Sequence, residues 1–323
     1  MALGTNHVTN TTAATFIPEL WSDEIIAAYK SNLVLGNLVS KMPMKGKKGD
    51  TLHIPKPTRG AASAKAAETQ VTLITNTESE IVVNINKHYE YSRMIEDITD
   101  VQALSSLRRF YTEDAGYALA KQIDTDLFYL STALDGGALV APGATAPADF
   151  VQSGKIFYVD GANGIADYAE DTVVPTDVFT DLAFRELVQK LDDADVPMTG
   201  RSLVIPPSAV NTIRGIDRYM SSDFVDGRGV ANGKIGTLYG IDVYVSTNCP
   251  VIETAAQNAA VGGGDVKLGL LFHKEAFVLA EQVGVRTQTQ YKQEYLADLM
   301  TADTLYGTQI LRPEAAVAIA LPA

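Results

Sequence analysis

Residues 99–137, TDVQALSSLRRFYTEDAGYALAKQIDTDLFYLSTALDGG, carry the clearest structural signal in the chain. Thr99 and Gln102 have the spacing of a capping box, which marks the start of a helix. Two glycines, Gly136 and Gly137, end the pattern. Between them, apolar residues recur at steps of mostly three or four positions: Val101, Leu104, Leu107, Tyr111, Ala115, Ala118, Ile123, Leu127 and Leu130. The sequence therefore predicts one helix of about 30 residues, which is about 45 Å long at about 1.5 Å per residue.

The same helix carries basic residues inside its apolar pattern. Arg108, Arg109 and Lys121 interrupt the heptad spacing that a two-stranded coiled coil requires. A helix of this length is long for a globular domain. We therefore expect it to pack along a sheet.

The segment before this helix predicts a two-stranded hairpin over residues 46–87. Its apolar residues alternate with polar ones, as in half-buried strands: Leu52, Ile54, Ile81, Val83 and Ile85. An Ala-rich tip near residues 61–67 joins the two strands. An isolated long hairpin is marginally stable in water, and no following segment has a pattern that would cover it. We therefore expect a neighbouring copy of the chain to support it.

The other segments predict a mixture of helices and strands. Near the N-terminus a short helix is expected, followed by an extended or turn-like stretch at Leu33–Val39. A second amphipathic helix is expected over Thr176–Leu191, with Val178, Leu182, Leu187 and Leu191 directed inward. A short helix is expected over 208–214, and strands over 156–159, 201–205, 241–246, 268–273, 277–280, 288–295, 305–311 and 315–321. Because helices and strands do not alternate regularly, the fold class is α+β.

The composition limits the possible classes of protein. The 323 residues are enough for one large domain or two or three smaller lobes, and 46% are hydrophobic. No run of 18 uncharged apolar residues occurs, so we expect no membrane span. Residues 1–14 lack the order of a secretory signal and predict a flexible arm. The net charge of −13 argues against a dedicated nucleic-acid binder; it suits the wall of a DNA container and equally improves solubility.

No catalytic, metal or cofactor motif is found in the sequence. The four histidines have no His or Cys neighbour at metal-ligand spacing. The only cysteine, Cys249, has no basic neighbour in sequence and is interpreted as a small, partly buried residue, so we expect no disulfide and a reducing cytoplasm during assembly. The loop that contains Gly227, Arg228, Gly229 and Gly233 departs from both dinucleotide-loop and phosphate-loop spacing, so we expect a flexible loop.

Charge is distributed unevenly along the chain. Residues 41–70 carry seven basic and two acidic residues, a net charge of +5. Residues 160–195 carry ten acidic and two basic residues, a net charge of −8. One hypothesis is that the two regions attract each other between copies; the alternative is two independently solvated surfaces. The candidate contact residues are Lys45, Lys47, Lys48, Lys56 and Arg59 in the basic region and Asp192, Asp193 and Asp195 in the acidic one. The three aspartates lack the spaced ligands of a calcium loop.

The order of these parts resembles a known family. An N-terminal arm, a basic hairpin, a very long helix, a compact α/β lobe and closing long strands follow one another. Four local sequence segments support the same resemblance: FIPELWS at 16–22, RSLVIPP at 201–207, GTLYGIDVYVS at 236–246 and YGTQILRPEA at 306–315. Together these features resemble the major capsid proteins of tailed bacteriophages (Caudoviricetes), which have the Hong Kong 97-type fold.

The resemblance implies a division of the chain into the family's domains. It predicts an N-terminal arm at 1–45, an extended E-loop at 46–93, and a peripheral P-domain at 94–134 and 275–306 whose spine helix is 97–134. Residues 135–171 would be connecting loops, and 172–274 with 307–323 would form the axial A-domain. Gly227, Arg228, Gly229 and Gly233 would then lie in a loop near the five- and six-fold axes.

The resemblance also implies function and partners. The chain would be a structural subunit without enzymatic activity or cofactor, assembling with itself into pentamers and hexamers of an icosahedral virion capsid in the host bacterial cytoplasm. We expect a separate scaffolding protein, a portal, a possible decoration protein, and packaged double-stranded DNA without sequence-specific contacts, and no membrane partner. We find no match to the Lys–Asn crosslink of some members and expect none. An encapsulin-type nanocompartment shell and a soluble α/β enzyme are the alternatives.

Overall fold

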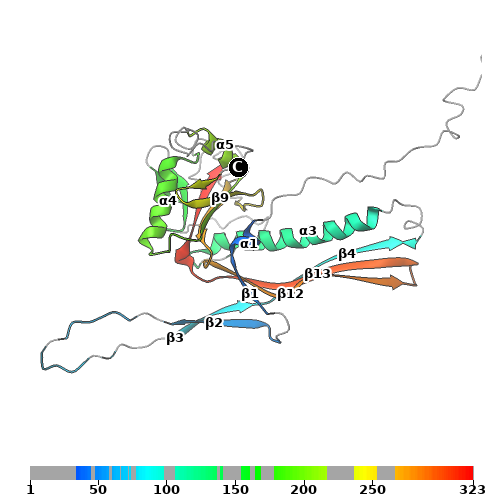
Figure 1. Ribbon diagram of the computed structural model, residues 1–323, viewed down its shortest axis with the longest axis horizontal. Helices are drawn as coiled ribbons and strands as arrows, with labels where there is room; N and C mark the ends of the chain where they lie inside the picture. The colour runs from blue at the N-terminus through cyan, green and yellow to red at the C-terminus, as the bar shows by residue number, and fades with distance from the viewer. Residues whose placement is uncertain are drawn as a thin grey trace, which may run out of the picture.

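The chain forms two sheets and a separate two-stranded hairpin. The computed structural model describes residues 34–44, 48–57, 60–65, 67–71, 73, 78–97, 106–136, 139–140, 154–160, 164–168, 178–216, 236–252 and 266–322. The hairpin and the long strands of one sheet extend in opposite directions from below a compact lobe (Figure 1). In the described part of the chain, no helix is both long and apolar enough to cross a membrane.

The long sheet has four strands in the order β1-β12-β13-β4. Their bounds are β1 Ser40–Pro43, β4 Lys87–Glu96, β12 Phe277–Lys292 and β13 Ala297–Ile310. The segment expected at 277–280 and the first part of the one expected at 288–295 belong to one strand, β12, which pairs antiparallel with β13 along its length. The expected second segment is too long, because β12 ends at Lys292 and residues 293–295 lie in the turn. The sheet has a register shift between Glu281 and Arg286, and such irregularities bend a strand.

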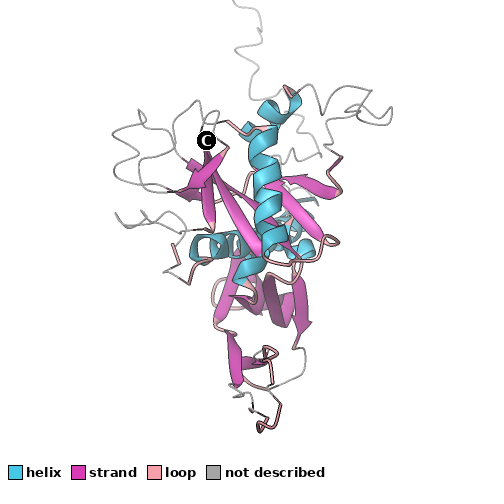
Figure 2. Cartoon of the chain, turned by 90° about the vertical axis from the view of Figure 1, so that its left-hand side faces the viewer, coloured by secondary structure: helices cyan, strands magenta, loops and turns pink. Residues whose placement is uncertain are grey.

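The predicted long helix lies along this sheet. α3, Ser106–Tyr129, continues as the 3-10 helix η2, Leu130–Ala133, and its expected start at Thr99 lies outside the described residues. Figures 1 and 2 show α3 running beside the long strands. Ala115 and Leu119 pack against Met300 and Ala302 of β13. The expectation of a helix packed on a sheet is confirmed.

The compact lobe is built on an eight-stranded sheet of order β6-β5-β14-β11-β7-β9-β8, with β10 paired to β11. Parallel pairs such as β7–β9 occur beside antiparallel pairs such as β11–β14, so the predicted α+β class is confirmed. The lobe also contains α5 and the 3-10 helix η4. The bounds are β5 Ile156–Val159, β6 Ile165–Asp167, β7 Arg201–Ile205, α5 Pro207–Arg214, β8 Thr237–Leu238, β9 Ile241–Val245, β10 Val251–Ile252, β11 Val266–His273, η4 Pro313–Ala315 and β14 Ala316–Pro322.

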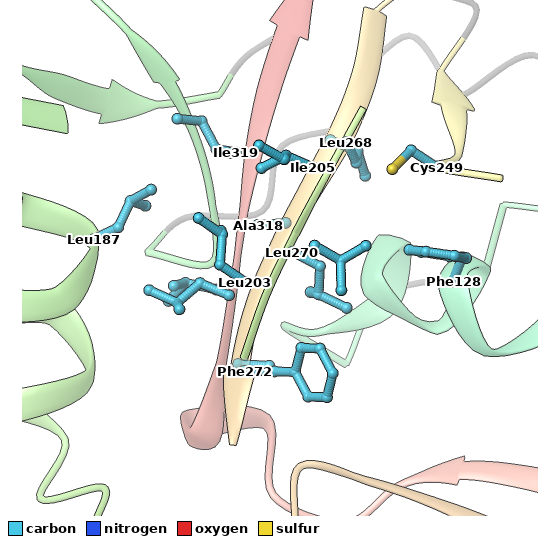
Figure 3. Close-up of a cluster of buried hydrophobic side chains, with 14 of the residues drawn as sticks. Phe128, Leu187, Leu203, Ile205, Cys249, Leu268, Leu270, Phe272, Ala318 and Ile319 are labelled. Carbon is cyan, nitrogen blue, oxygen red and sulfur yellow. The ribbon is translucent and has the colours of Figure 1, made fainter. Parts of the chain in front are cut away.

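Both faces of the lobe's sheet are covered by helices. The second amphipathic helix is α4, Asp181–Asp193. Figure 3 shows Leu187 of α4 and Phe128 of α3 on opposite sides of strands that carry Leu203 and Leu270. All four side chains are buried. A sheet buried on both faces explains why its strands are continuous apolar runs.

The helix α4 begins five residues later than the predicted range Thr176–Leu191. The Thr180 hydroxyl accepts a hydrogen bond from the backbone N–H of Ala183 at 3.1 Å, and this N-cap fixes the start of the helix. Val178 therefore lies before the helix and is 41% exposed, so its predicted inward direction is wrong.

A second correction concerns residues 33–39. They were expected to be extended or turn-like, but they contain a short helix, α1, Leu35–Leu38. Four residues are too few for a helix that is stable by itself. The contact that stabilises it comes from α3, as described below.

The predicted two-stranded hairpin is present, and its environment differs in part from the expectation. β2, Thr51–Pro57, pairs antiparallel with β3, Glu78–Asn84, so that Leu52 faces Val83 and Ile54 faces Ile81. The expectation that no other segment covers the hairpin is wrong for its root, where Val83 and Ile85 pack in one cluster with Met44, Val278 and Ala280. In Figures 1 and 2 the described part of the hairpin lies below the helices.

Candidate assembly surfaces

The outer part of the hairpin has no cover from the part of the chain that the structure describes. Every described residue from Pro55 to Glu80 is exposed. Two apolar side chains near the tip are among the most exposed of the large hydrophobic residues that the structure describes, Val71 at 67% and Leu73 at 89%. We call residues 55–80 the hairpin arm. Contiguous exposed apolar surface marks sites of contact with another molecule, and these two neighbouring side chains are candidates for such a contact.

The root of the hairpin is fixed to the long sheet by a close backbone crossing. The chain at Asn84–Ile85 passes directly over Gly307 of β13, and a Cβ atom at Gly307 would collide with the carbonyl oxygen of Asn84. Glycine is the one residue that permits such an approach. The direction in which the arm leaves the body is therefore set at this crossing.

A buried polar cluster fastens Lys87 and Tyr89, at the start of β4, to α3. The Asp126 carboxylate forms an ion pair with Lys87 Nζ at 3.0 Å and accepts a hydrogen bond from the Tyr306 hydroxyl at 2.8 Å. Gln122 donates to the same carboxylate at 3.0 Å. Burial, together with the nearby Asp126 charge, raises the pKa of Tyr306 well above its ordinary value, so this hydroxyl stays protonated and donates. Tyr89 stacks on Tyr306 and completes the cluster.

A second exposed apolar group lies at the far end of the long sheet. Met94 is 46% exposed, Tyr291 44%, Tyr295 63% and Leu296 65%. The last two belong to the turn between β12 and β13, in which Leu296 has a positive φ of 46°. We call these four residues the sheet tip. The hairpin arm and the sheet tip thus expose apolar side chains at opposite ends of the molecule (Figure 1).

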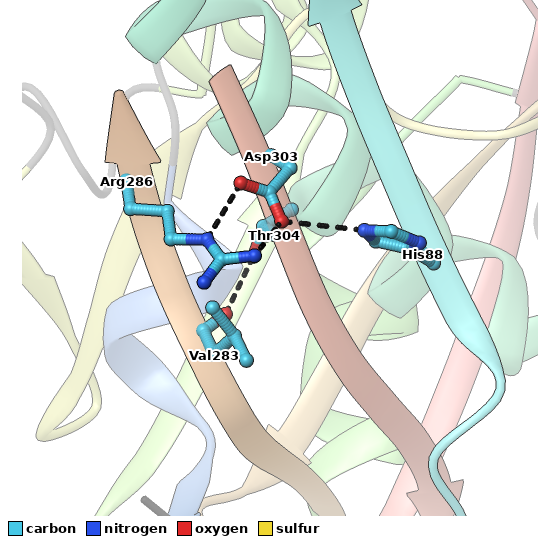
Figure 4. Close-up of polar contacts among 5 residues, drawn as sticks. All are labelled: His88, Val283, Arg286, Asp303 and Thr304. Atoms are coloured by element: carbon cyan, nitrogen blue, oxygen red, sulfur yellow. Dashed lines mark hydrogen bonds and ion pairs between the residues drawn. The ribbon is translucent and has the colours of Figure 1, made fainter. Parts of the chain in front are cut away.

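A charged network crosses three strands of the long sheet. Arg286 Nε lies 2.7 Å from Asp303 Oδ1, and His88 Nε2 lies 3.3 Å from Asp303 Oδ2 (Figure 4). Hydrogen bonding to Arg286 lowers the pKa of Asp303 below its ordinary value. The Thr304 hydroxyl donates to the carbonyl oxygen of Val283, next to the register shift. Sequence analysis missed this network because its members come from three distant strands.

A groove of about 850 Å³ separates the hairpin root from the compact lobe. Ile54, Lys56 and Ile81 line it on the hairpin side, and Asp195 and Pro197 line it on the lobe side. Lys56 of the basic hairpin and Asp195 of the acidic lobe thus line the same groove within one chain.

The sequence-predicted contact residues fall into different environments. Lys48, Lys56, Asp193 and Asp195 are exposed. Asp192 is exposed too, and its carboxylate forms an ion pair at 2.7 Å with the buried side chain of Arg201 of the same chain. The candidates that the structure describes do not form one cluster. The remaining candidates lie outside the described residues: Lys45, Lys47, Arg59, Gly227, Arg228, Gly229 and Gly233.

Arg201 shows why the acidic turn after α4 is ordered. Its guanidinium also donates to the carbonyl oxygens of Val196 at 2.6 Å and Pro197 at 3.0 Å. The cationic side chain thus satisfies the turn's carbonyl groups and one of its carboxylates. Asp192 therefore has a structural role within the chain.

The described residues offer no site for a metal ion. No group of three or more His, Cys, Asp or Glu side chains with suitable geometry occurs in the part of the chain that the structure describes. Cys249 is buried, and burial raises the pKa of its thiol to about 12. A thiol with this pKa is protonated and unreactive at neutral pH.

Comparison with known proteins identifies the family. A family model described as phage capsid protein matches residues 16–321. The chain belongs to the phage capsid protein family. No curated protein matches the chain.

Solved structures agree with the family in fold. The structure of Mycobacterium phage Che8 is 24% identical, with a TM-score of 0.68 over 94% of this chain and 97% of that one. The capsid of the cyanophage P-SCSP1u is 20% identical, with a TM-score of 0.69 over 98% of this chain and 96% of that one. The capsid of Ralstonia phage GP4 is 13% identical, with a TM-score of 0.65 over 95% of each chain.

This capsid protein thus has the Hong Kong 97-type fold, as the resemblance implied. It is a structural protein, a major capsid subunit, that associates with itself in the shell of a virion. The family explains why two ends of the molecule expose apolar side chains: its subunits act as parts of an assembly.

Proposed function

We propose that this capsid subunit forms pentamers and hexamers of an icosahedral shell that encloses double-stranded DNA, and that it has no enzymatic activity. The observation that carries the proposal is the hairpin arm, which is exposed throughout its described residues and has Leu73 at 89% exposure. Contacts between different patches of identical subunits are heterologous, and such contacts close into rings. A hairpin arm reaching an adjacent subunit is a contact of this type.

The proposal includes the division into domains. The E-loop comprises the hairpin, the P-domain comprises α3 with the long sheet, and the A-domain comprises the compact lobe. The expected boundary between E-loop and P-domain, at residues 93 and 94, falls inside β4, which pairs with β13 from Lys87 to Glu96. We therefore propose that the P-domain begins at Lys87. The N-terminal arm precedes β1, which extends the same sheet at its other edge.

The proposed partners follow from the same assembly. They are other copies of the chain, a separate scaffolding protein, a portal, a possible decoration protein and packaged DNA held without sequence-specific contacts. The net charge of −13 supports the last point, because an acidic wall does not adhere to the polymer that it encloses. Assembly in the bacterial cytoplasm is consistent with a single, buried cysteine.

Electron cryo-microscopy of particles purified from infected cells, combined with analysis of their contents, tests this function. The expected result is an icosahedral lattice of five- and six-fold capsomers containing nuclease-protected DNA. A lattice that encloses protein cargo would assign the chain to a nanocompartment shell. A monodisperse monomer under assembly conditions would refute the proposal.

Charge complementarity between copies is a separate part of the proposal. Replacement of Lys45, Lys47 and Lys48 by Glu reverses the charge at the base of the hairpin, and we expect it to reduce the yield of particles at least about tenfold while the subunit stays folded. The Lys→Arg variants at the same three positions retain the charge and are the control. Particles at normal yield from the Glu variant would show that the two charged regions are independently solvated.

A further inference from the structure

A buried carboxylate on α3 joins three parts of the chain that are far apart in sequence. Asp124 is 2% exposed and lies in the carboxyl-terminal half of α3. Its Oδ1 atom accepts hydrogen bonds from the backbone N–H groups of Val34, Leu35 and Gly36, at 3.2, 2.8 and 3.3 Å. Its Oδ2 atom accepts a hydrogen bond from the side-chain amide of Asn248 at 3.1 Å.

The three backbone donors belong to the start of α1. The first N–H groups of a helix have no acceptor inside the helix. The N-cap residue is Val34, whose apolar side chain cannot accept a hydrogen bond from them. Asp124 supplies that acceptor from a helix about 90 residues away in sequence. The short helix α1 therefore depends on α3, and it leads directly into β1 of the long sheet.

The fourth donor belongs to the compact lobe. Asn248 lies in the turn after β9, where its backbone N–H donates to the Ser246 hydroxyl at 3.2 Å. The neighbouring Cys249 thiol donates to the carbonyl oxygen of Ser246 at 3.3 Å. The turn is thus ordered by its own contacts, and the Asn248 side chain is its link to α3.

The carboxylate is held by neutral donors. Burial raises the pKa of Asp124, and the hydrogen bonds from Asn248 and from the three backbone N–H groups act in the opposite direction. Within the described residues, no cationic side chain pairs with Asp124. A buried charge is costly unless it is hydrogen-bonded. Removing either set of donors therefore makes the buried carboxylate less stable and weakens its hydrogen bonds to the other set.

We propose that Asp124 is a latch that fastens the chain at residues 34–36 and the turn at Ser246–Cys249 to α3 as one unit. The two segments are held or released together, so a displacement of the N-terminal segment is transmitted to the compact lobe. Asp126, two positions along the helix, fastens the hairpin root and β13 instead. The latch concerns contacts within one chain, so it goes beyond the proposed function and does not depend on it.

Hydrogen–deuterium exchange of the full-length chain measures the latch directly. In the Asp124→Ala variant we expect peptides covering 34–44 and 246–252 to exchange at least about tenfold faster than in the wild type, because four donors lose a charged acceptor. Glu113→Gln, which removes an exposed carboxylate from the same helix, is the control and should change neither peptide.

A second pair of variants separates the two halves of the latch. Asn248→Leu removes the amide that donates to Oδ2 and leaves Oδ1 as the acceptor for the backbone N–H groups of residues 34–36. We expect faster exchange of the 246–252 peptide and also of the 34–44 peptide, because the latch releases the two segments together. The double variant of Asp124→Asn with Asn248→Asp exchanges the acceptor and the donor of this hydrogen bond and should restore protection.

The outcomes decide between a latch and two independent contacts. If Asp124→Ala accelerates exchange in one peptide only, or in neither, the proposal is overturned. If Asn248→Leu accelerates exchange of the 246–252 peptide alone, the two contacts are independent and the proposal is overturned as well. If Asp124→Ala does not fold, the Asn248→Leu variant and the double variant of Asp124→Asn with Asn248→Asp decide. Failure of the double variant to restore the 246–252 peptide would then overturn the proposal, whether or not the chain still assembles into shells.

Discussion

The compact lobe and the hairpin arm belong to the same chain but differ in how far their apolar residues are buried. The lobe buries its strands between α4 and the end of α3, so that Leu203, Leu270 and Leu187 are at most 1% exposed. The hairpin arm leaves Val71 and Leu73 at 67% and 89% exposure. The lobe buries its apolar residues within its own fold, whereas the proposed assembly assigns the cover of the arm to another copy. Substitutions in the lobe should therefore lower stability, and substitutions in the arm should lower assembly.

The largest effect on stability is expected in the core of the lobe. Phe184 is fully buried and packs against the rings of Phe179 and Tyr239, with ring centroids 6.0 and 5.8 Å away. Phe184→Ala should lower the free energy of unfolding by about 3–5 kcal/mol, because it removes a large side chain and leaves a cavity. Urea denaturation of the unassembled subunit measures this, with the exposed Val178→Ala as control. Equal midpoints for both variants would contradict the account.

An intermediate effect is expected where the arm joins the body. Gly307→Ala places a Cβ against the Asn84 carbonyl oxygen, and we expect a loss of about 1–3 kcal/mol in the free energy of unfolding, together with poor assembly because the arm leaves in another direction. Gly116→Ala is the matched control: a Cβ there meets nothing within 4 Å, inside a helix, and should stabilise the chain by about 1 kcal/mol.

The outcome at Gly307 decides whether the backbone crossing there sets the direction of the arm. A fully stable Gly307→Ala subunit that assembles normally would mean that the chain crosses the strand without a close backbone contact. A destabilised subunit that still assembles would mean that the direction of the arm is not set at this point.

At the tip of the arm we expect almost no effect on stability. Leu73→Asp changes a side chain that is 89% exposed, so the free energy of unfolding should stay within about 0.5 kcal/mol of the wild type. Particle yield should nevertheless fall at least about tenfold, because a charge replaces an apolar contact in a buried interface. Sedimentation of assembly reactions measures the yield, and normal yield would show that the tip does not contact another copy.

The smallest effect is expected at Asp303, and it should disappear in acid. Its pKa lies below the ordinary value of 3.8 because Arg286 hydrogen-bonds to it. Its stabilising contribution is therefore present above about pH 3.8 and is lost as pH falls through the lowered pKa. Asp303→Asn should lower the melting temperature slightly at pH 5, and the difference from the wild type should shrink toward pH 2. A difference that stays constant over this range would contradict the assignment.

The sequence predicts the parts of the fold that depend on periodicity. The apolar spacing of α3 places Ala115, Ile123 and Leu127 on its buried face, as observed. Alternation in the hairpin predicts the apolar positions Leu52 and Ile54, which face Val83 and Ile81 across the two strands. These signals are local, so one sequence is sufficient to recognise them.

Contacts between distant segments could not be predicted in this way. The helix α1 depends on Asp124, which lies about 90 positions away, so its own residues indicate only an extended stretch. The close crossing at Gly307 depends on Asn84 in another strand. The candidate charges were chosen from local density alone, and that density does not reveal that Asp192 is bound to Arg201.

The accessibility of a thiol at the tip of the arm tests the central claim most directly. Cys249 is the only cysteine, and it is buried with a thiol pKa of about 12, so Leu73→Cys introduces a single reactive thiol. We expect rapid labelling with a maleimide in the unassembled subunit and labelling at least about tenfold slower in assembled shells, because a second copy covers the tip. Equal rates in the two states would contradict the claim that another copy supplies the cover that the arm lacks.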